Sequence, residues 1–155
     1  MPLFHFSIYV KLNSICKTYL NGIEFMARMT LAVHPQLFTI HSLAPDTIVP
    51  SSIFQQEIYF IGKTREELSV VVDSTFEIDS LEQEHGWSCL EVLGPLGFSM
   101  TGILSSVSGA LAEQKISIFA ISTFDTDYIL VKKETLAEAT KALKKKNYQI
   151  INHQR

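Results

Sequence analysis

Apolar residues between positions 100 and 111 recur at intervals of three and four, the spacing of one buried helix face. These residues are Met100, Ile103, Leu104, Val107 and Leu111. Glycines and a proline precede them at 94–97, so we expect the helix to begin at Met100 with Ser99 as its N-cap. The third helical position would then be Gly102 rather than a glutamate, so no capping box covers the first turn. The amides of residues 101–103 are therefore predicted to remain accessible.

Two apolar segments follow this helix. Residues 116–124 are typical of a strand that is apolar on both faces, 125–126 form a short turn, and 127–132 return as a second strand. With 87–93 as a strand before the helix, the first four predicted elements are strand, helix, strand and strand.

The last part of the chain predicts a helix and a strand. Thr135 and Glu138 have the spacing of a capping box, the apolar helix positions begin at Leu136, and Asn147 follows three lysines as a plausible C-terminal cap. Residues 148–152 can form a final strand. The order β-α-β-β-α-β predicts an α+β fold, the ferredoxin-like sandwich of two helices on an antiparallel sheet.

The N-terminal half is rich in strands and poor in helices. Residues 31–33 and 37–43 flank His34-Pro35-Gln36 and are predicted to form a hairpin; 57–61 and 68–72 are two further strands. Residues 73–86 are predicted to be a polar joint. We therefore expect one unit at 29–80 and a second at 87–152. Residues 1–28 fit neither and are interpreted as an extension, with an over-extended start codon as one hypothesis that intact-mass analysis would test.

Two segments of the sequence carry a resemblance to a known family. They are Gly94-Pro95-Leu96-Gly97-Phe98-Ser99-Met100-Thr101-Gly102-Ile103-Leu104 and Ile116-Ser117-Ile118-Phe119-Ala120-Ile121-Ser122-Thr123-Phe124-Asp125-Thr126-Asp127-Tyr128-Ile129-Leu130-Val131. Together they closely resemble the ACT domain in its aspartokinase-like form, and in particular small tandem-ACT bacterial proteins similar to the CASTOR amino-acid sensors. The resemblance covers most of 87–151 and extends more loosely back to about residue 30. It implies a degenerate ACT-like lobe at 29–80.

The resemblance also implies a ligand site. In ACT domains an amino acid commonly lies between the N-terminus of the first helix and the adjoining strand of a neighbouring lobe. Carried over to this chain, the helix side is Ser99, Met100, Thr101, Gly102 and Ile103. The strand side is Ile121, Ser122, Thr123 and Phe124, followed by Asp125 in the turn.

Physical chemistry agrees with this placement and leaves two alternatives open. A helix N-terminus binds a carboxylate through free amides, and a strand end can accept an ammonium group through carbonyls or a carboxylate. An open first turn can equally bind only water, and Asp125 and Asp127 can bracket the turn for backbone reasons alone. The neutral Ser99 weakens any expectation of a cationic ligand.

Composition excludes several classes of function. The net charge of −3, with Lys144–Lys146 as the only basic cluster, argues against a nucleic-acid partner. Neither the two cysteines nor the five histidines have metal-ligand spacing, so no metal site and no cofactor are predicted. We find no catalytic residue set and no membrane span, and two cysteines without a convincing signal peptide suggest a reducing cytoplasm.

We therefore expect a regulatory protein rather than an enzyme. It would bind a free amino acid at a lobe or subunit interface, assemble as a homo-oligomer (a dimer), and act on a protein partner. The alternative is a structural dimerisation module without a ligand. An RNA-binding ferredoxin-like domain is a more distant third, since the strands lack basic residues.

Overall fold

The computed structural model describes residues 17–20, 23–26, 29–94 and 102–153. Its strands are β1 (Lys17–Leu20), β2 (Ile23–Met26), β3 (Thr30–Leu43), β4 (Tyr59–Lys63), β5 (Leu68–Asp73), β6 (Glu82–Leu93), β7 (Ile118–Ser122), β8 (Asp127–Lys132) and β9 (Gln149–Asn152). Its helices are the 3-10 helices η1 (Ser51–Gln55) and η2 (Lys133–Thr135) and the α-helices α1 (Ile103–Ala112) and α2 (Leu136–Lys145).

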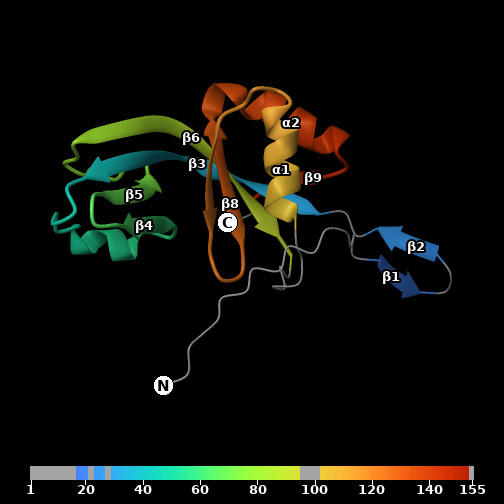
Figure 1. Ribbon diagram of the computed structural model, residues 1–155, viewed down its shortest axis with the longest axis horizontal. Coiled ribbons are helices and arrows are strands. Elements are labelled where there is room, and N and C mark those ends of the chain that lie inside the picture. The colour runs from blue at the N-terminus through green and yellow to red at the C-terminus, as the bar shows by residue number, and fades with distance from the viewer. Residues whose placement is uncertain (1–16, 21–22, 27–28, 95–101, 154–155) are drawn as a thin grey trace, which may run out of the picture.

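The C-terminal half has the predicted order of elements. β6, α1, β7, β8, α2 and β9 follow one another as β-α-β-β-α-β, and both α-helices lie on the same side of the sheet (Figure 1). β8 pairs antiparallel with both β6 and β7. The α+β class and the ferredoxin-like arrangement are therefore confirmed.

One sheet runs through both halves of the described chain. Its strand order is β4-β5-β3-β6-β8-β7, and β9 pairs with β3 in parallel. β3 thus lies between β6 and β9, pairing with β9 along its first part and with β5 along its last part. Residues 82–86, predicted to belong to a polar joint, are instead the beginning of β6. The strands β3 and β6 consequently contribute to both halves.

The hairpin predicted around His34-Pro35-Gln36 is wrong, because β3 is one continuous strand with an irregularity at that point. Val33 pairs with Leu90 of β6, and the next paired residue, Leu37, pairs with Ser88. Between these two pairs, β3 therefore contains more residues than β6. The additional residues on β3 form a bulge that includes Pro35. Proline has no amide hydrogen to donate to a ladder and is tolerated at such bulges, so a turn signal in the sequence marks a bulge here.

A second irregularity lies in β6 at Gly86. Phe38 of β3 pairs with Trp87 of β6, and Ile40 pairs with Glu84. Between these two pairs, β6 contains one residue more than β3. Gly86 has φ of 76°, in the left-handed region that glycine adopts without a steric penalty. This position therefore requires glycine for its backbone conformation.

We expect Gly86→Ala to lower the free energy of unfolding by about 1–2 kcal/mol, because a Cβ disfavours left-handed backbone. Gly62→Ala is the matched control: Gly62 lies in β4, has no positive φ, and has no atom within 4 Å of an added Cβ. Urea unfolding of both variants measures the difference. Equal stability of the two variants would contradict the role assigned to the bulge.

The helices bury their apolar faces against one side of the sheet. Val107, Ala110 and Leu111 of α1 and Ala139 and Leu143 of α2 belong to one cluster with buried residues of β3, β6 and β8. Of the predicted face of α1, Val107 and Leu111 are fully buried, and Ile103 and Leu104 are partly buried. A second cluster, Phe38, Val71, Trp87, Cys89 and Leu130, comes from four neighbouring strands. Along β6 and β8, residues of this second cluster alternate with residues of the cluster under the helices. Because successive side chains of a strand point to opposite faces, the second cluster lies on the face of the sheet away from the helices.

Several predicted ends of elements need correction. α1 begins at Ile103 rather than Met100, and Gly102 is its N-cap with φ of 87°, which a right-handed helix cannot include. The capping box of α2 does not form, because the Thr135 hydroxyl donates to the carbonyl of Lys132 at 2.9 Å, at the end of β8. Asn147 has φ of 73° just after α2 and is the predicted C-terminal cap.

Candidate functional site

Among the described residues, the start of α1 carries backbone amides that no intrahelical bond uses. The first intrahelical bond runs from the amide of Ser106 to the carbonyl of Gly102, at 2.8 Å. The amides of residues 103–105 precede that bond and have no acceptor within the helix. The first turn of α1 carries no acidic residue, and Gly102 is exposed and has no side chain with which to cap. Within the described residues the amides of 103–105 are candidate donors to a ligand, while residue 101 of the predicted set 101–103 lies outside the described part of the chain, so the accessibility of that set stays a prediction.

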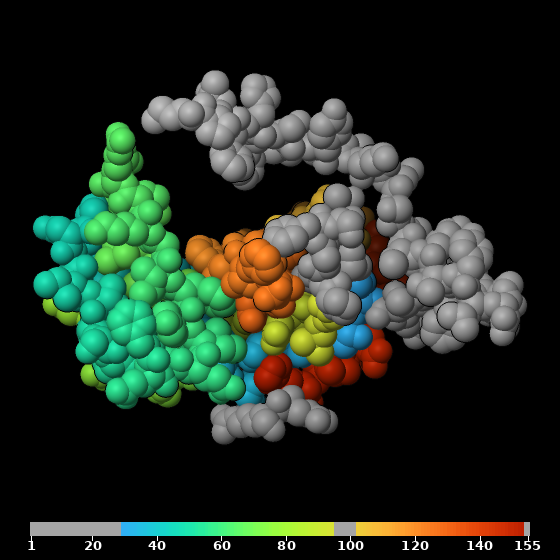
Figure 2. Space-filling view, turned by 90° about the horizontal axis from the view of Figure 1, so that it is seen from below, coloured from blue at the N-terminus to red at the C-terminus, as the bar shows by residue number. Residues whose placement is uncertain are grey.

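Hydrogen bonds close the turn between β7 and β8. The Thr123 amide donates to the carbonyl of Thr126 at 2.9 Å, and the Thr123 hydroxyl donates to the same carbonyl at 3.0 Å. β7 therefore ends at Ser122 and does not reach Phe124. Figure 2 shows this part of the chain, in orange, at the surface seen from below. The side chain of Phe124 is 75% exposed.

The two aspartates of this turn are in different situations. The Asp127 carboxylate accepts a hydrogen bond from the Ser122 hydroxyl at 2.5 Å, across the first pair of the hairpin. Asp125 lies exposed in the turn. A hydrogen bond thus supports the turn interpretation for Asp127, while a ligand role for Asp125 stays a prediction.

The register of the sheet places the start of α1 and this turn at the same edge. Glu91 of β6, Tyr128 of β8 and Ile121 of β7 form one row across the three strands. β6 and β7 both run antiparallel to β8, so they end on the same side, where α1 begins after β6. Figure 1 shows the start of α1 and the β7–β8 turn at the same lower end of the domain.

The predicted site residues divide into two groups. Ser99, Met100 and Thr101 lie outside the described residues. Gly102, Ile103, Ile121, Ser122, Thr123, Phe124 and Asp125 lie at the edge just defined, and all but Ile103 and Ile121 are exposed. Their role in binding a ligand stays a prediction.

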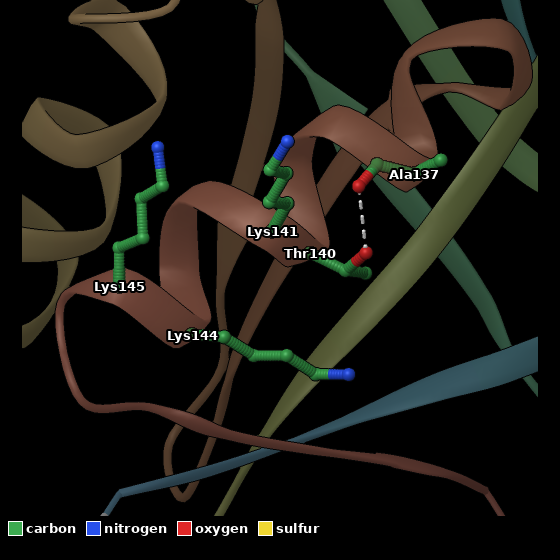
Figure 3. A pocket seen from close by; sticks show the side chains of 5 residues that line it. All are labelled: Ala137, Thr140, Lys141, Lys144 and Lys145. Carbon is green, nitrogen blue, oxygen red and sulfur yellow. Dashed lines mark hydrogen bonds between the residues drawn. The ribbon is translucent and has the colours of Figure 1, made fainter.

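A surface hollow on α2 is a different feature. Ala137, Thr140, Lys141, Lys144 and Lys145 line it. In Figure 3 the ammonium groups of Lys141 and Lys144 point in different directions, and the Thr140 hydroxyl donates to the Ala137 carbonyl of its own helix at 3.0 Å. These lysines do not converge on a common point, and we assign no ligand to the hollow.

Two pieces of side-chain chemistry bear on the expectations from sequence. Cys89 is fully buried, and this burial raises the pKa of its thiol to about 12, so it is not an activated nucleophile. The structure also brings together His34, Glu91 and His153, three residues with no ligand spacing in sequence. Sequence reasoning missed this grouping, and its one local signal is the irregular segment at His34-Pro35 inside a strand.

Comparison with known proteins supplies a family. A model of the ACT domain matches residues 82–145. The human protein CASTOR3P is 32% identical over 102 residues, which are 56% of this chain and 61% of that protein. The match therefore spans less than two thirds of the length of this relative.

Solved structures agree with that match. A protein from Agobacterium tumefaciens superposes with a TM-score of 0.75 at 28% identity, covering 83% of this chain and 96% of its own. The ligand-free regulatory subunit of aspartate kinase from Thermus thermophilus superposes with a TM-score of 0.56 at 13% identity, covering 74% of this chain and 95% of its own. The second likeness concerns the fold alone.

Among the helices in the described part of the chain, none has the length and apolar character needed to cross a membrane.

ACT domains are regulatory domains that commonly bind amino acids. Both the matched residues 82–145 and the β-α-β-β-α-β order coincide with the half that holds the candidate site. Residues 82–145 of the chain therefore match an ACT domain.

Proposed function

We propose that this protein is a regulatory amino-acid-binding protein whose ligand lies between the start of α1 and the β7–β8 turn. The observation that carries the proposal is the first turn of α1, which has no side-chain cap and no acidic residue, at the same sheet edge as the end of β7. Membership of a regulatory domain family and the structural likeness to a regulatory subunit of aspartate kinase support it.

The chemistry of a free amino acid suits this edge. Its carboxylate would accept hydrogen bonds from the amides of residues 103–105, where the helix dipole is positive and no acidic side chain of the first turn competes. Its ammonium group would meet the exposed carboxylate of Asp125 or a backbone carbonyl of the turn. Backbone groups fixed by folding would thus recognise the part common to all amino acids, and neighbouring side chains would select among them.

A second subunit would complete the site. The described residues on both sides of the edge are mostly exposed, whereas small-molecule sites usually bury most of their ligand. ACT domains typically oligomerise, so we propose a homodimer in which the partner covers the ligand. Ligand binding would then shift the equilibrium between assembly states or the affinity for a regulated protein, because the ligand binds those states unequally. We also propose that the protein acts in the cytoplasm.

Thermal unfolding in the presence of each of the twenty amino acids tests the proposal. A ligand at 100 times its Kd adds about 2.7 kcal/mol to stability. For a chain of this size we expect the midpoint to rise by about 5–10 °C with one or a few amino acids. If none of them changes the midpoint, the structural dimerisation module becomes the better account.

A matched pair of variants locates the effect. Gly102→Asp places a negative charge beside the proposed carboxylate site, and Gly102→Asn places a neutral side chain of the same shape there. Because Gly102 has φ of 87°, both substitutions strain the backbone, so the test compares two similarly strained proteins. We expect Asp to abolish the ligand-induced shift and Asn to retain part of it. Equal shifts in both variants would move the site elsewhere.

A further inference from the structure

Three potential ligand atoms converge on the face of the sheet opposite the helices. The Nε2 atom of His34 lies 2.9 Å from Oε2 of Glu91, and the Nε2 atom of His153 lies 3.4 Å from the same oxygen. All three atoms lie within 4.8 Å of one another. We call these residues the histidine–glutamate cluster.

Separate elements hold each member in place. His34 belongs to the bulge of β3, and bulges commonly redirect a side chain near a functional site. Glu91 lies on β6, on the same face as Cys89. His153 follows β9, where its amide donates to the Val33 carbonyl at 2.8 Å and extends the pairing of β9 with β3. The positions of all three therefore depend on β3 being one strand between β6 and β9.

The two imidazole rings are arranged alike. Their centroids are 4.2 Å apart with an angle of 21° between the planes, and both Nε2 atoms lie close to one carboxylate oxygen. The side chain of His34 is 2% exposed, that of Glu91 is 17% exposed and that of His153 is 28% exposed. One side of the cluster is thus closed by protein and the other is open to solvent.

The protonation state of the buried histidine suits coordination. Burial lowers the pKa of His34, and its hydrogen bond with Glu91 only partly offsets that effect. A neutral imidazole can offer the Nε2 lone pair when its proton is on Nδ1. A neighbouring carboxylate supplies the negative charge that a divalent cation requires.

We propose that His34, Glu91 and His153 bind a divalent transition-metal ion, with Zn²⁺ as the ion the site accepts readily. Two imidazoles and one carboxylate are a common three-residue ligand set for Zn²⁺, with solvent in the fourth position. Metal–ligand bonds of about 2.0–2.2 Å in a tetrahedron place the ligand atoms about 3.3 Å apart. The separations of 2.9 and 3.4 Å to Glu91 are close to this value, so binding mainly requires the two stacked imidazoles to turn toward a common point.

This site is distinct from the amino-acid site proposed above. The cluster lies on the helix-free face of the sheet, with Phe38 and Tyr128 beside His34 at ring-centroid distances of 6.5 and 6.4 Å. The amino-acid screen can be run in EDTA, so either proposal can fail without the other.

The test uses the full chain without a polyhistidine tag, stripped of metal with EDTA and then dialysed. Titration with ZnCl₂ by calorimetry is expected to show one saturable equivalent. Titration with CoCl₂ is expected to produce the visible absorption bands of Co²⁺ in a low-symmetry protein site. His153→Gln and Glu91→Gln are each expected to weaken Zn²⁺ binding at least about tenfold. The partial exposure of both side chains makes them less risky for folding than a substitution of buried His34, and circular dichroism checks each fold.

His85→Gln is the matched control, because His85 is an exposed histidine whose Nδ1 contacts the Thr39 hydroxyl at 3.1 Å, outside the cluster. It should bind Zn²⁺ as the unmodified protein does. Absence of a saturable equivalent, or unchanged affinity in either His153→Gln or Glu91→Gln, would overturn the proposal. The cluster would then be a hydrogen-bonded group that only joins β3, β6 and the end of β9.

Discussion

Leu111→Ala is expected to lower the free energy of unfolding by about 2–5 kcal/mol. Leu111 is fully buried in the cluster that joins α1 and α2 to β3, β6 and β8. Removing three side-chain carbons there loses the favourable burial of the leucine and leaves a cavity that the two helices and the sheet can fill only partly. For a chain of this size, a loss of 3 kcal/mol lowers the thermal midpoint by about 6–12 °C.

Leu81→Ala is the matched control, since it removes the same atoms from a side chain that is 74% exposed. We expect that variant to stay within about 0.5 kcal/mol of the unmodified protein in urea unfolding. Similar losses in both variants would contradict the packing of α1 on the sheet.

Phe38→Ala is expected to cost about 3–5 kcal/mol and to destabilise both halves together. Phe38 is 1% exposed and packs with Val71, Trp87 and Leu130, so one ring contacts a cluster built from β3, β5, β6 and β8. Because β3 and β6 run through both halves, we expect neither half to unfold before the other.

The single tryptophan makes this measurable. Fluorescence of Trp87 reports on the second cluster, and circular dichroism at 222 nm reports mainly on α1 and α2. The two signals should change in one coincident transition, displaced equally by Phe38→Ala. Phe54→Ala is the control, because Phe54 on η1 is 63% exposed. A helix signal that persists after the fluorescence has changed would show two independently folding units instead.

The sequence was most informative where local signals and the hydrophobic pattern agreed. β8 runs from Asp127 to Lys132 as predicted, and Asn147 provides the expected left-handed cap of α2. In each case the determinant is local: a continuous apolar run between charged ends, or a residue that tolerates positive φ. α1 was predicted to begin three residues too early, because the sequence does not reveal that Gly102 adopts a left-handed conformation.

Long-range pairing could not be predicted in the same way. Pro35 marks a hairpin or a bulge equally well in sequence, and only the neighbours β6 and β9 keep β3 extended through it. The same pairing assembles His34, Glu91 and His153, whose separation along the chain hides any metal-ligand spacing. The edge formed by α1 and the β7–β8 turn, in contrast, follows from the β-α-β-β-α-β order once the family resemblance is recognised.

The central claim is that an amino acid contacts the start of α1 and the β7–β8 turn. Amide chemical shifts of ¹⁵N-labelled protein, measured while the amino acid with the largest thermal effect is added, test it most directly. We predict saturable changes concentrated in the amides of residues 102–105 and 121–125. Changes confined to other parts of the chain, such as the lysine-lined hollow of α2, or no changes with any amino acid, would contradict it.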